Sequence, residues 1–261
     1  MSAVLPARRR DTGARAPEPR PRRLEPVAGR PPVLVQQWAE IVWIHWRVDP
    51  ADVQALLPPA LRVDTFDGSA WVGLVPFEMR DLRPVIAGRV LPAVGSTRSF
   101  SEVNVRTYVT GPAGPGVWFH SLDATSRLAV GVARSLWSLP YRYAAVDRKL
   151  GPQRRWWSVA RPDGTAGRAG VTLGPAVATT PLDAFLTARF RLYAPLTRSR
   201  LLTAPVRHDE WSLLRAGIDD LDPGLVGAAG YRLGARGGSP DHVVAGRPVD
   251  VAVGLPSLLP A

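Results

Sequence analysis

Alternating apolar and polar positions along the chain predict a mainly β protein. Residues 36–48 are rich in Trp, Ile and Val, and residues 61–66 and 70–77 flank Asp67-Gly68, a strong signal for a hairpin turn. Residues 101–109 alternate most regularly of all. Further strands are predicted at residues 117–122, 141–150, 154–161, 184–193, 203–211 and 249–253.

Two short helices interrupt this pattern. The first has Asp49 as its N-cap and Pro50 at its first position, and Pro58 ends it. The second is predicted from apolar residues at helical spacing between Asp123, its predicted cap, and Pro140. The helices are too few to change the fold class, which stays mainly β (α+β).

Two stretches show no clear period. Residues 80–99 are predicted to form a loop long enough to act as a lid or a cavity wall, and the chain after Leu213 reads as Gly-rich loop. Antiparallel strands of these lengths usually close into a barrel or pack as a sandwich.

The strand at residues 101–109 has two different faces. Val103, Val105, Thr107 and Val109 share one face, and the other carries the polar set Glu102, Asn104, Arg106 and Tyr108. A polar face on such a strand is ordinarily solvated, but it could equally line a polar cavity.

Composition bounds the organisation of the chain. Its 261 residues, 46% of them hydrophobic, suit a single domain, which we place at residues 33–257. Residues 1–32 read as a disordered leader rich in Arg and Pro. Residues 1–30 hold eight arginines against three acidic residues, so the leader carries much of the net charge of +11.

Several functional classes are disfavoured by composition and motifs. The chain has no Cys, no histidine pair at metal-ligand spacing and no Gly-rich phosphate loop, so we expect neither a metal site nor a cofactor. Outside the leader no arranged basic and aromatic motif indicates specific nucleic-acid binding, and no stretch is apolar enough for a membrane helix. The absence of Cys fits a cytoplasmic protein.

His45 is the best of the four histidines as a ligand-binding candidate. It lies between two Trp residues in an apolar strand and shares its face with Arg47. His208 is second, because acidic residues adjoin it. A satisfied structural role is the alternative for each histidine.

Four blocks of sequence carry a family resemblance. Residues 42–84, 101–109, 119–143 and 185–211 include the runs VWIHWRVDPADVQALLPPAL, SEVNVRTYV, FHSLDATSRLAVGVARSLWSLPYRY and FLTARFRLYAPLTRSRLLTAPVRHDEW. They resemble the YqjF-like conserved proteins, which look like a branch of the acetoacetate decarboxylase superfamily. The resemblance implies a closed antiparallel β-barrel or cone with a few short helices, and by analogy a homo-oligomer.

The resemblance also points to a change in chemistry. In the decarboxylases the proline after the second helix precedes two lysines; the first forms an imine with the substrate ketone and the second lowers its pKa. Here Tyr141 and Arg142 follow Pro140, and neither can form an imine. Lys149 is the only lysine in the chain and lies eight residues beyond Tyr141.

Other pocket positions match only in part. Glu102 corresponds to a pocket glutamate of the decarboxylases, whereas a second pocket glutamate has no counterpart in the run AWVGLV. The position of the decarboxylases' substrate-binding arginine falls near Trp38–Ala39 in this sequence, so that arginine is not matched.

Two functions follow as hypotheses. The first is a protein that binds a small keto- or carboxylate-type molecule in a central cavity, with Arg142, Arg106, His45 and Arg47 as ligand-binding candidates. The second is a lyase- or hydrolase-type enzyme in which Glu102 is the general acid or base and Tyr141 donates a hydrogen bond. A buried ion pair between Glu102 and Arg142 is the purely structural alternative.

Overall fold

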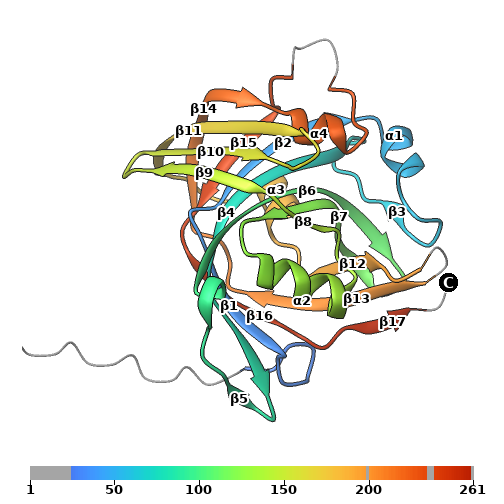
Figure 1. Cartoon of the computed structure of the whole chain (residues 1–261). Coiled ribbons are helices and arrows are strands. Elements are labelled where there is room, and N and C mark those ends of the chain that lie inside the picture. The colour runs from blue at the N-terminus through green and yellow to red at the C-terminus, as the bar shows by residue number, and fades with distance from the viewer. Residues whose placement is uncertain (1–24, 198–199, 234–237, 260–261) are drawn as a thin grey trace, which may run out of the picture.

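Seven strands close into a β-barrel in the computed structural model, which describes residues 25–197, 200–233 and 238–259 (Figure 1). The closed order is β1–β4–β6–β7–β12–β13–β16 and back to β1. Their bounds are β1 Leu34–Ala39, β4 Ala70–Ile86, β6 Ser99–Gly111, β7 Gly114–Ala124, β12 Arg191–Pro195, β13 Leu201–His208 and β16 Val249–Val253. The mainly β closed barrel is thus confirmed, with one difference: β7 and β12 pair in parallel.

A second layer of strands extends from the barrel and packs over its outside. It runs in the order β2–β15–β14–β11–β10–β9, starting from β2, which also pairs with β4. The bounds are β2 Val42–Val48, β9 Ala145–Leu150, β10 Arg154–Ala160, β11 Ala166–Ala176, β14 Leu213–Asp222 and β15 His242–Gly246. Minor strands are β3 Arg62–Val63, β5 Arg89–Val90, β8 Tyr141–Tyr143 and β17 Ser257–Leu259.

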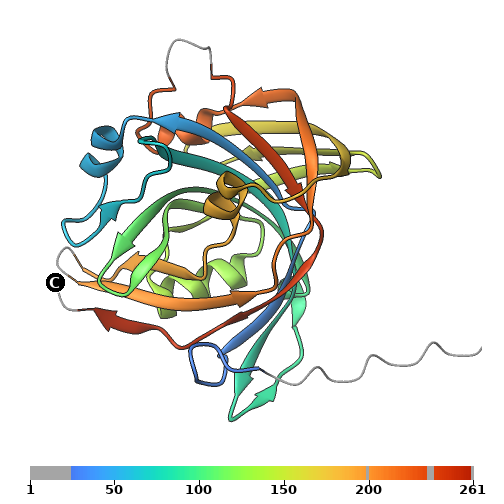
Figure 2. The same ribbon diagram turned by 180° about the vertical axis from the view of Figure 1, so that it is seen from behind.

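Short helices fill the connections of the described chain. Their bounds are α1 Pro50–Ala55, α2 Arg127–Trp137, α3 Pro181–Thr187, α4 Gly224–Ala228 and the 3-10 turn η1 Gly95–Thr97. The helix α2 lies in front of the barrel in Figure 1 and α3 lies in front of it when the molecule is seen from behind in Figure 2. These two helices therefore cover opposite ends of the barrel.

Strand alternation divides the apolar residues between an outer core and a central cavity. On β6, Val103, Val105 and Val109 face the core between the barrel and the second layer. Glu102 and Arg106 point the other way, to the cavity inside the barrel. The polar face of this strand therefore lines a cavity and is not a solvated surface.

The start of α1 and the hairpin turn follow the sequence signals. The Asp49 side chain accepts a hydrogen bond from the backbone amide of Ala51, as expected of an N-cap. Asp67 and Gly68 both have positive φ, 51° and 73°, as a two-residue type I′ turn requires.

Several local expectations were wrong. The cap of α2 is Ser126, whose side chain accepts from the Ala129 amide, because Asp123 is buried in β7 with Arg161. The predicted strand at residues 184–193 begins as helix α3, since Thr180 forms a capping box with Asp183.

The two predicted loops are partly regular. The strand β4 continues through residues 80–86 and pairs with β5, and β14, α4 and β15 occupy much of the stretch after Leu213. The predicted strand at 36–48 breaks at Glu40, which has a φ of 54°.

Only the end of the predicted leader, residues 25–32, can be compared with the structure, because residues 1–24 lie outside the described residues. From Glu25 onward the chain lies against the barrel: Val27 is buried, and Glu25 forms an ion pair with Arg207. Within the described ranges, no helix has the length and apolarity that a membrane crossing requires.

Candidate functional site

The interior of the barrel holds a cavity of about 880 Å³. That volume lies within the usual range for small-molecule sites. Apolar and aromatic side chains form most of its wall, among them Trp38, Ile41, Trp43, Val75, Phe77, Met79, Phe100, Leu122, Trp137, Leu192 and Trp211. The cavity is therefore a mainly apolar chamber into which a few polar groups project.

Glu102 and Tyr141 meet on the cavity wall. The Tyr141 hydroxyl donates a hydrogen bond of 2.8 Å to Glu102 Oε2. Two strands bring them together, because Glu102 pairs with Ala124 of β7 and Tyr141 pairs with Leu122 of the same strand. Glu102 is 2% exposed and forms no ion pair among the described residues, so its charge is not neutralised locally.

Burial dominates the acid–base behaviour of this pair. Loss of water raises the pKa of Glu102 from 4.5 to about 7, although hydrogen bonds from Tyr141 and Asn104 oppose the rise. The pKa of Tyr141 is raised well above 10 by burial and by the neighbouring carboxylate. Near neutral pH, Glu102 can therefore accept or release a proton, while Tyr141 keeps its proton and donates it in a hydrogen bond.

Cationic side chains gather at the α3 end of the cavity. Arg106 is 8% exposed; its Nη2 donates to the backbone oxygen of Leu186 at 2.9 Å, and its buried Nε has no partner. Arg189 and Arg191 also line the cavity. Arg189 is paired with Asp64 at 2.7 Å. The Nε of Arg106 is therefore available to donate a hydrogen bond to an anionic group.

His45 lies behind this cationic end and is not one of the residues that line the cavity. Its Nε2 is 2.7 Å from the hydroxyl of Tyr108, which donates to the oxygen of Leu186 at 2.7 Å. Tyr108 has only one proton to donate, so His45 Nε2 is the donor in the first bond. Burial first, and then His242 and Arg106, hold the pKa of His45 well below 6.5. Neutral His45 thus supports Tyr108, which also contacts Arg106.

Space for the His45 ring comes from Gly73. The two residues are paired across β2 and β4, and a Cβ at position 73 would lie 2.9 Å from the ring. The isolated glycine in the run AWVGLV is therefore explained by close packing of a buried histidine.

Besides His45, two more of the predicted ligand-binding residues do not line the cavity. Arg47 is exposed at the end of β2, where its guanidinium stacks over Trp71 at 4.6 Å. Arg142 is exposed on β8, because neighbouring residues of a strand point to opposite sides and Tyr141 takes the cavity side. The suggested Glu102–Arg142 ion pair is therefore absent from the structure.

Sequence reasoning missed the aromatic wall and the second cationic strand. Trp38 and Trp211 stack at 6.3 Å with an interplanar angle of 9°, and His208 lies 5.3 Å from Trp211. Trp38 comes from β1, and His208 from β13, so only closure of the barrel brings them together. The two cavity arginines had a signal in the sequence, because the alternation of Arg189 and Arg191 puts both on one face of the chain.

Lys149 lies outside the cavity. It is exposed on β9, with its ammonium group 5.4 Å from the ring of Trp156. Among the residues that the structure describes, no group of His, Asp or Glu side chains is arranged to hold a metal ion.

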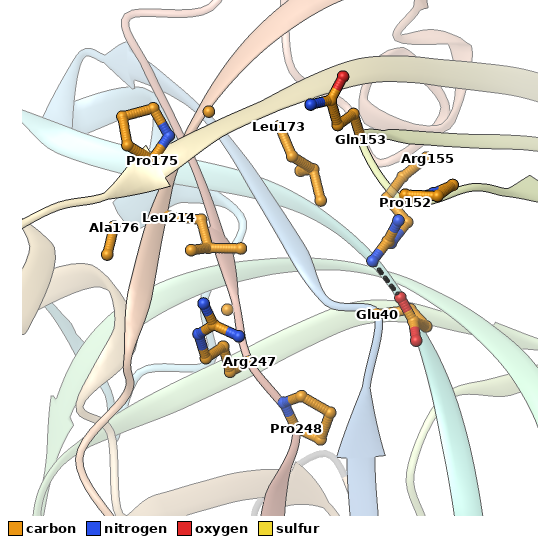
Figure 3. A pocket seen from close by; sticks show the side chains of 12 residues that line it. Glu40, Pro152, Gln153, Arg155, Leu173, Pro175, Ala176, Leu214, Arg247 and Pro248 are labelled. Atoms are coloured by element: carbon orange, nitrogen blue, oxygen red, sulfur yellow. Dashed lines mark ion pairs between the residues drawn. The ribbon is translucent and has the colours of Figure 1, made fainter.

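A separate pocket of about 520 Å³ lies between the second layer and the barrel (Figure 3). Glu40 lies at its edge, and its carboxylate contacts Arg155 at 2.6 Å and Arg80 at 3.1 Å. The Glu40 carboxylate at this pocket is therefore already paired with two arginines.

The barrel and its connections put this chain in the class of proteins with an acetoacetate decarboxylase-like fold. An acetoacetate decarboxylase-like enzyme from Sphingomonas wittichii RW1 matches with a TM-score of 0.60 and 16% identity over 88% of this chain and 94% of that chain. Acetoacetate decarboxylase from Legionella pneumophila matches at 0.58 and 12%, over 93% and 92%. The enduracididine biosynthesis enzyme MppR, solved with pyruvate, matches at 0.56 and 14%, over 87% and 90%.

Within that class, the chain belongs to the DUF2071 family of uncharacterized conserved proteins, whose model matches residues 35–250. It is 36% identical to the uncharacterized protein YqjF of Bacillus subtilis over 189 residues, which are 70% of this chain and 76% of YqjF. The resemblance inferred from the sequence blocks is therefore confirmed.

Proposed function

We propose that this protein binds a small organic acid of the keto or carboxylate type inside the barrel. The observation that carries the proposal is the hydrogen bond of 2.8 Å between the partly buried Tyr141 and the buried Glu102, on the wall of an apolar cavity that Arg106 also lines. On binding, the Tyr141 hydroxyl would turn from Glu102 and donate its proton to a carbonyl or hydroxyl oxygen of the ligand. Arg106 would bind its carboxylate through the Nε that has no partner.

The proposal excludes imine chemistry in the cavity. By resemblance, Tyr141 stands at the position of the decarboxylases' imine-forming lysine, and tyrosine cannot form an imine. Lys149 is exposed on the second layer. MppR was solved with pyruvate, a keto acid, so the same fold accommodates this ligand class in one distant relative. The absence of nucleic-acid, membrane and metal partners, a homo-oligomeric state and a cytoplasmic location stay predictions.

Binding can be tested by titrating the protein with acetoacetate and with pyruvate. Trp38, Trp43 and Trp211 line the cavity, so intrinsic tryptophan fluorescence reports its occupancy. We expect saturable quenching that Tyr141→Phe weakens about tenfold, the upper end for loss of one hydrogen bond. Leu150→Gln, a change on the outer strand β9, is the control and should bind as the wild type does. Equal affinities of Tyr141→Phe and wild type would contradict the proposed role.

A second candidate function is an acid–base enzyme of the lyase or hydrolase type. It is favoured by one specific observation: burial raises the pKa of Glu102 to about 7, where a general base works best at neutral pH. Incubation with the same acids, followed by NMR of the small molecules, would reveal turnover. Glu102→Gln should abolish it and Lys149→Arg should leave it intact; activity that survives in Glu102→Gln would exclude the general-base role.

A further inference from the structure

The cavity is polar at one end and apolar at the other. At the α3 end, Arg106 is held by the Leu186 oxygen, and the buried Thr187 of α3 lines the cavity. At the α2 end, Leu128 and Val132 line the cavity while being 47% and 43% exposed to solvent. Side chains that both line a cavity and contact solvent mark its opening, so the opening is apolar.

Glu102 lies between these two ends. The neighbouring Ser101 accepts a hydrogen bond from the Thr125 amide, directly before α2, so this part of β6 is next to the opening. Four residues further along β6, Arg106 is held away from Glu102 by its bonds to Leu186 and Tyr108. At about 3.3 Å per residue, the two Cα atoms are roughly 13 Å apart.

A short acid cannot contact both Arg106 and Glu102 and also fill the apolar opening. An extended chain of about ten carbons is needed to span a similar distance, because single carbon–carbon bonds are about 1.5 Å long and zigzag. Beyond Glu102 the wall continues through exposed apolar residues, and Leu91 and Val94 add to it at the opening. Exposed apolar side chains around a pocket are a common mark of a binding groove.

We infer that the ligand is an organic acid with an apolar chain of at least about ten carbons, its carboxylate at Arg106 and its chain directed past Glu102 to the opening beside α2. This inference rests on the proposed function and specifies its ligand class. An oxygen substituent along the chain would meet the Tyr141 hydroxyl. The apolar wall would provide most of the affinity, and Arg106 would set the orientation.

The inference is tested by the chain-length dependence of binding to the full-length protein. Butanoate, hexanoate, octanoate and decanoate are titrated below their aggregation concentrations, with tryptophan fluorescence as the readout. Each buried methylene should lower Kd about fourfold, so decanoate, with its additional methylenes all buried, should bind roughly three to four orders of magnitude more tightly than butanoate. A flat or falling series would overturn the inference.

Two variants test the two ends separately. Leu128→Gln should weaken decanoate binding and leave butanoate unchanged, whereas Leu150→Gln, an exposed leucine of the second layer, should change neither. Arg106→Gln should lower the affinity for octanoate about ten- to hundredfold, because a hydrogen bond to a charged group is lost. The variant should then bind octanoate about as weakly as it binds 1-octanol, which has no carboxylate. If Arg106→Gln does not fold, as judged by circular dichroism, the Leu128 variant and the chain series still decide.

The outcomes separate this inference from the proposed function. Binding of acetoacetate that is sensitive to Tyr141→Phe, without a gain along the chain series, would overturn the long-chain ligand and leave the binding function standing. Failure of every acid to bind would contradict the proposed function as well. Equal loss of decanoate in Leu128→Gln and Leu150→Gln would contradict the assigned opening.

Discussion

The ionisation of Glu102 should make the protein less stable as the pH rises from 4.5 to 7. Its pKa is raised from 4.5 to about 7 in the folded protein because it is buried. A carboxyl with a raised folded pKa contributes stability that is fully present below the unfolded pKa and is lost as the pH passes through the folded one. Each pH unit between the two values corresponds to about 1.4 kcal/mol, so the loss amounts to about 3 kcal/mol.

Glu102→Gln removes this dependence. Glutamine is neutral at every pH and its side-chain oxygen can still accept the Tyr141 hydrogen bond. The variant should match the wild type near pH 4.5 and exceed it by about 3 kcal/mol at pH 8. With a urea slope of about 3 kcal/mol per M for a chain of this size, the midpoint should rise by about 1 M.

The assay is equilibrium urea unfolding of both proteins at steps of about half a pH unit, beginning at the unfolded pKa of Glu102 and ending well above its folded pKa of about 7. Tyr141→Phe provides an internal check, since it removes a hydrogen bond that lowers the pKa of Glu102 and so should move the stability loss to higher pH. Glu210→Gln, an exposed carboxylate replaced in the same way, is the control for charge removal alone. A stability difference between Glu102→Gln and wild type that does not change with pH would refute the reasoning.

Three further predictions concern the cavity and its supports. Tyr141→Lys should form an imine with a 3-oxo acid that borohydride traps, giving a mass increase at position 141; the wild type, whose only lysine is exposed, should show none in the cavity. Gly73→Ala should lower stability by about 1–3 kcal/mol in thermal or urea unfolding, because the added Cβ would lie 2.9 Å from the His45 ring; an unchanged midpoint would contradict that packing. Arg161→Gln should cost about 3–5 kcal/mol, since it leaves the fully buried Asp123 unpaired; a loss under 1 kcal/mol would show that the pair is dispensable.

Local signals in the sequence predicted much of the fold. The alternation at residues 101–109 separated the Val side from the side that carries Glu102 and Arg106, and the caps and turns at Asp49 and Asp67 were read correctly. These features depend on side-chain periodicity and on backbone bonds within a few residues. That Tyr141 stands where the decarboxylases have a lysine stays a prediction from the sequence blocks.

Long-range pairing decided the rest. The same alternation is compatible with a solvated face or a cavity, and only closure of β1 onto β16 put Glu102 inside the barrel. The pKa of Glu102 depends on that burial, which no local pattern encodes. Alternation within β8 turned Arg142 to solvent, and the parallel pairing of β12 with β7 brought Arg191 to the cavity. The sequence by itself determined which residues share a strand face, and the tertiary structure decided which faces lose their water.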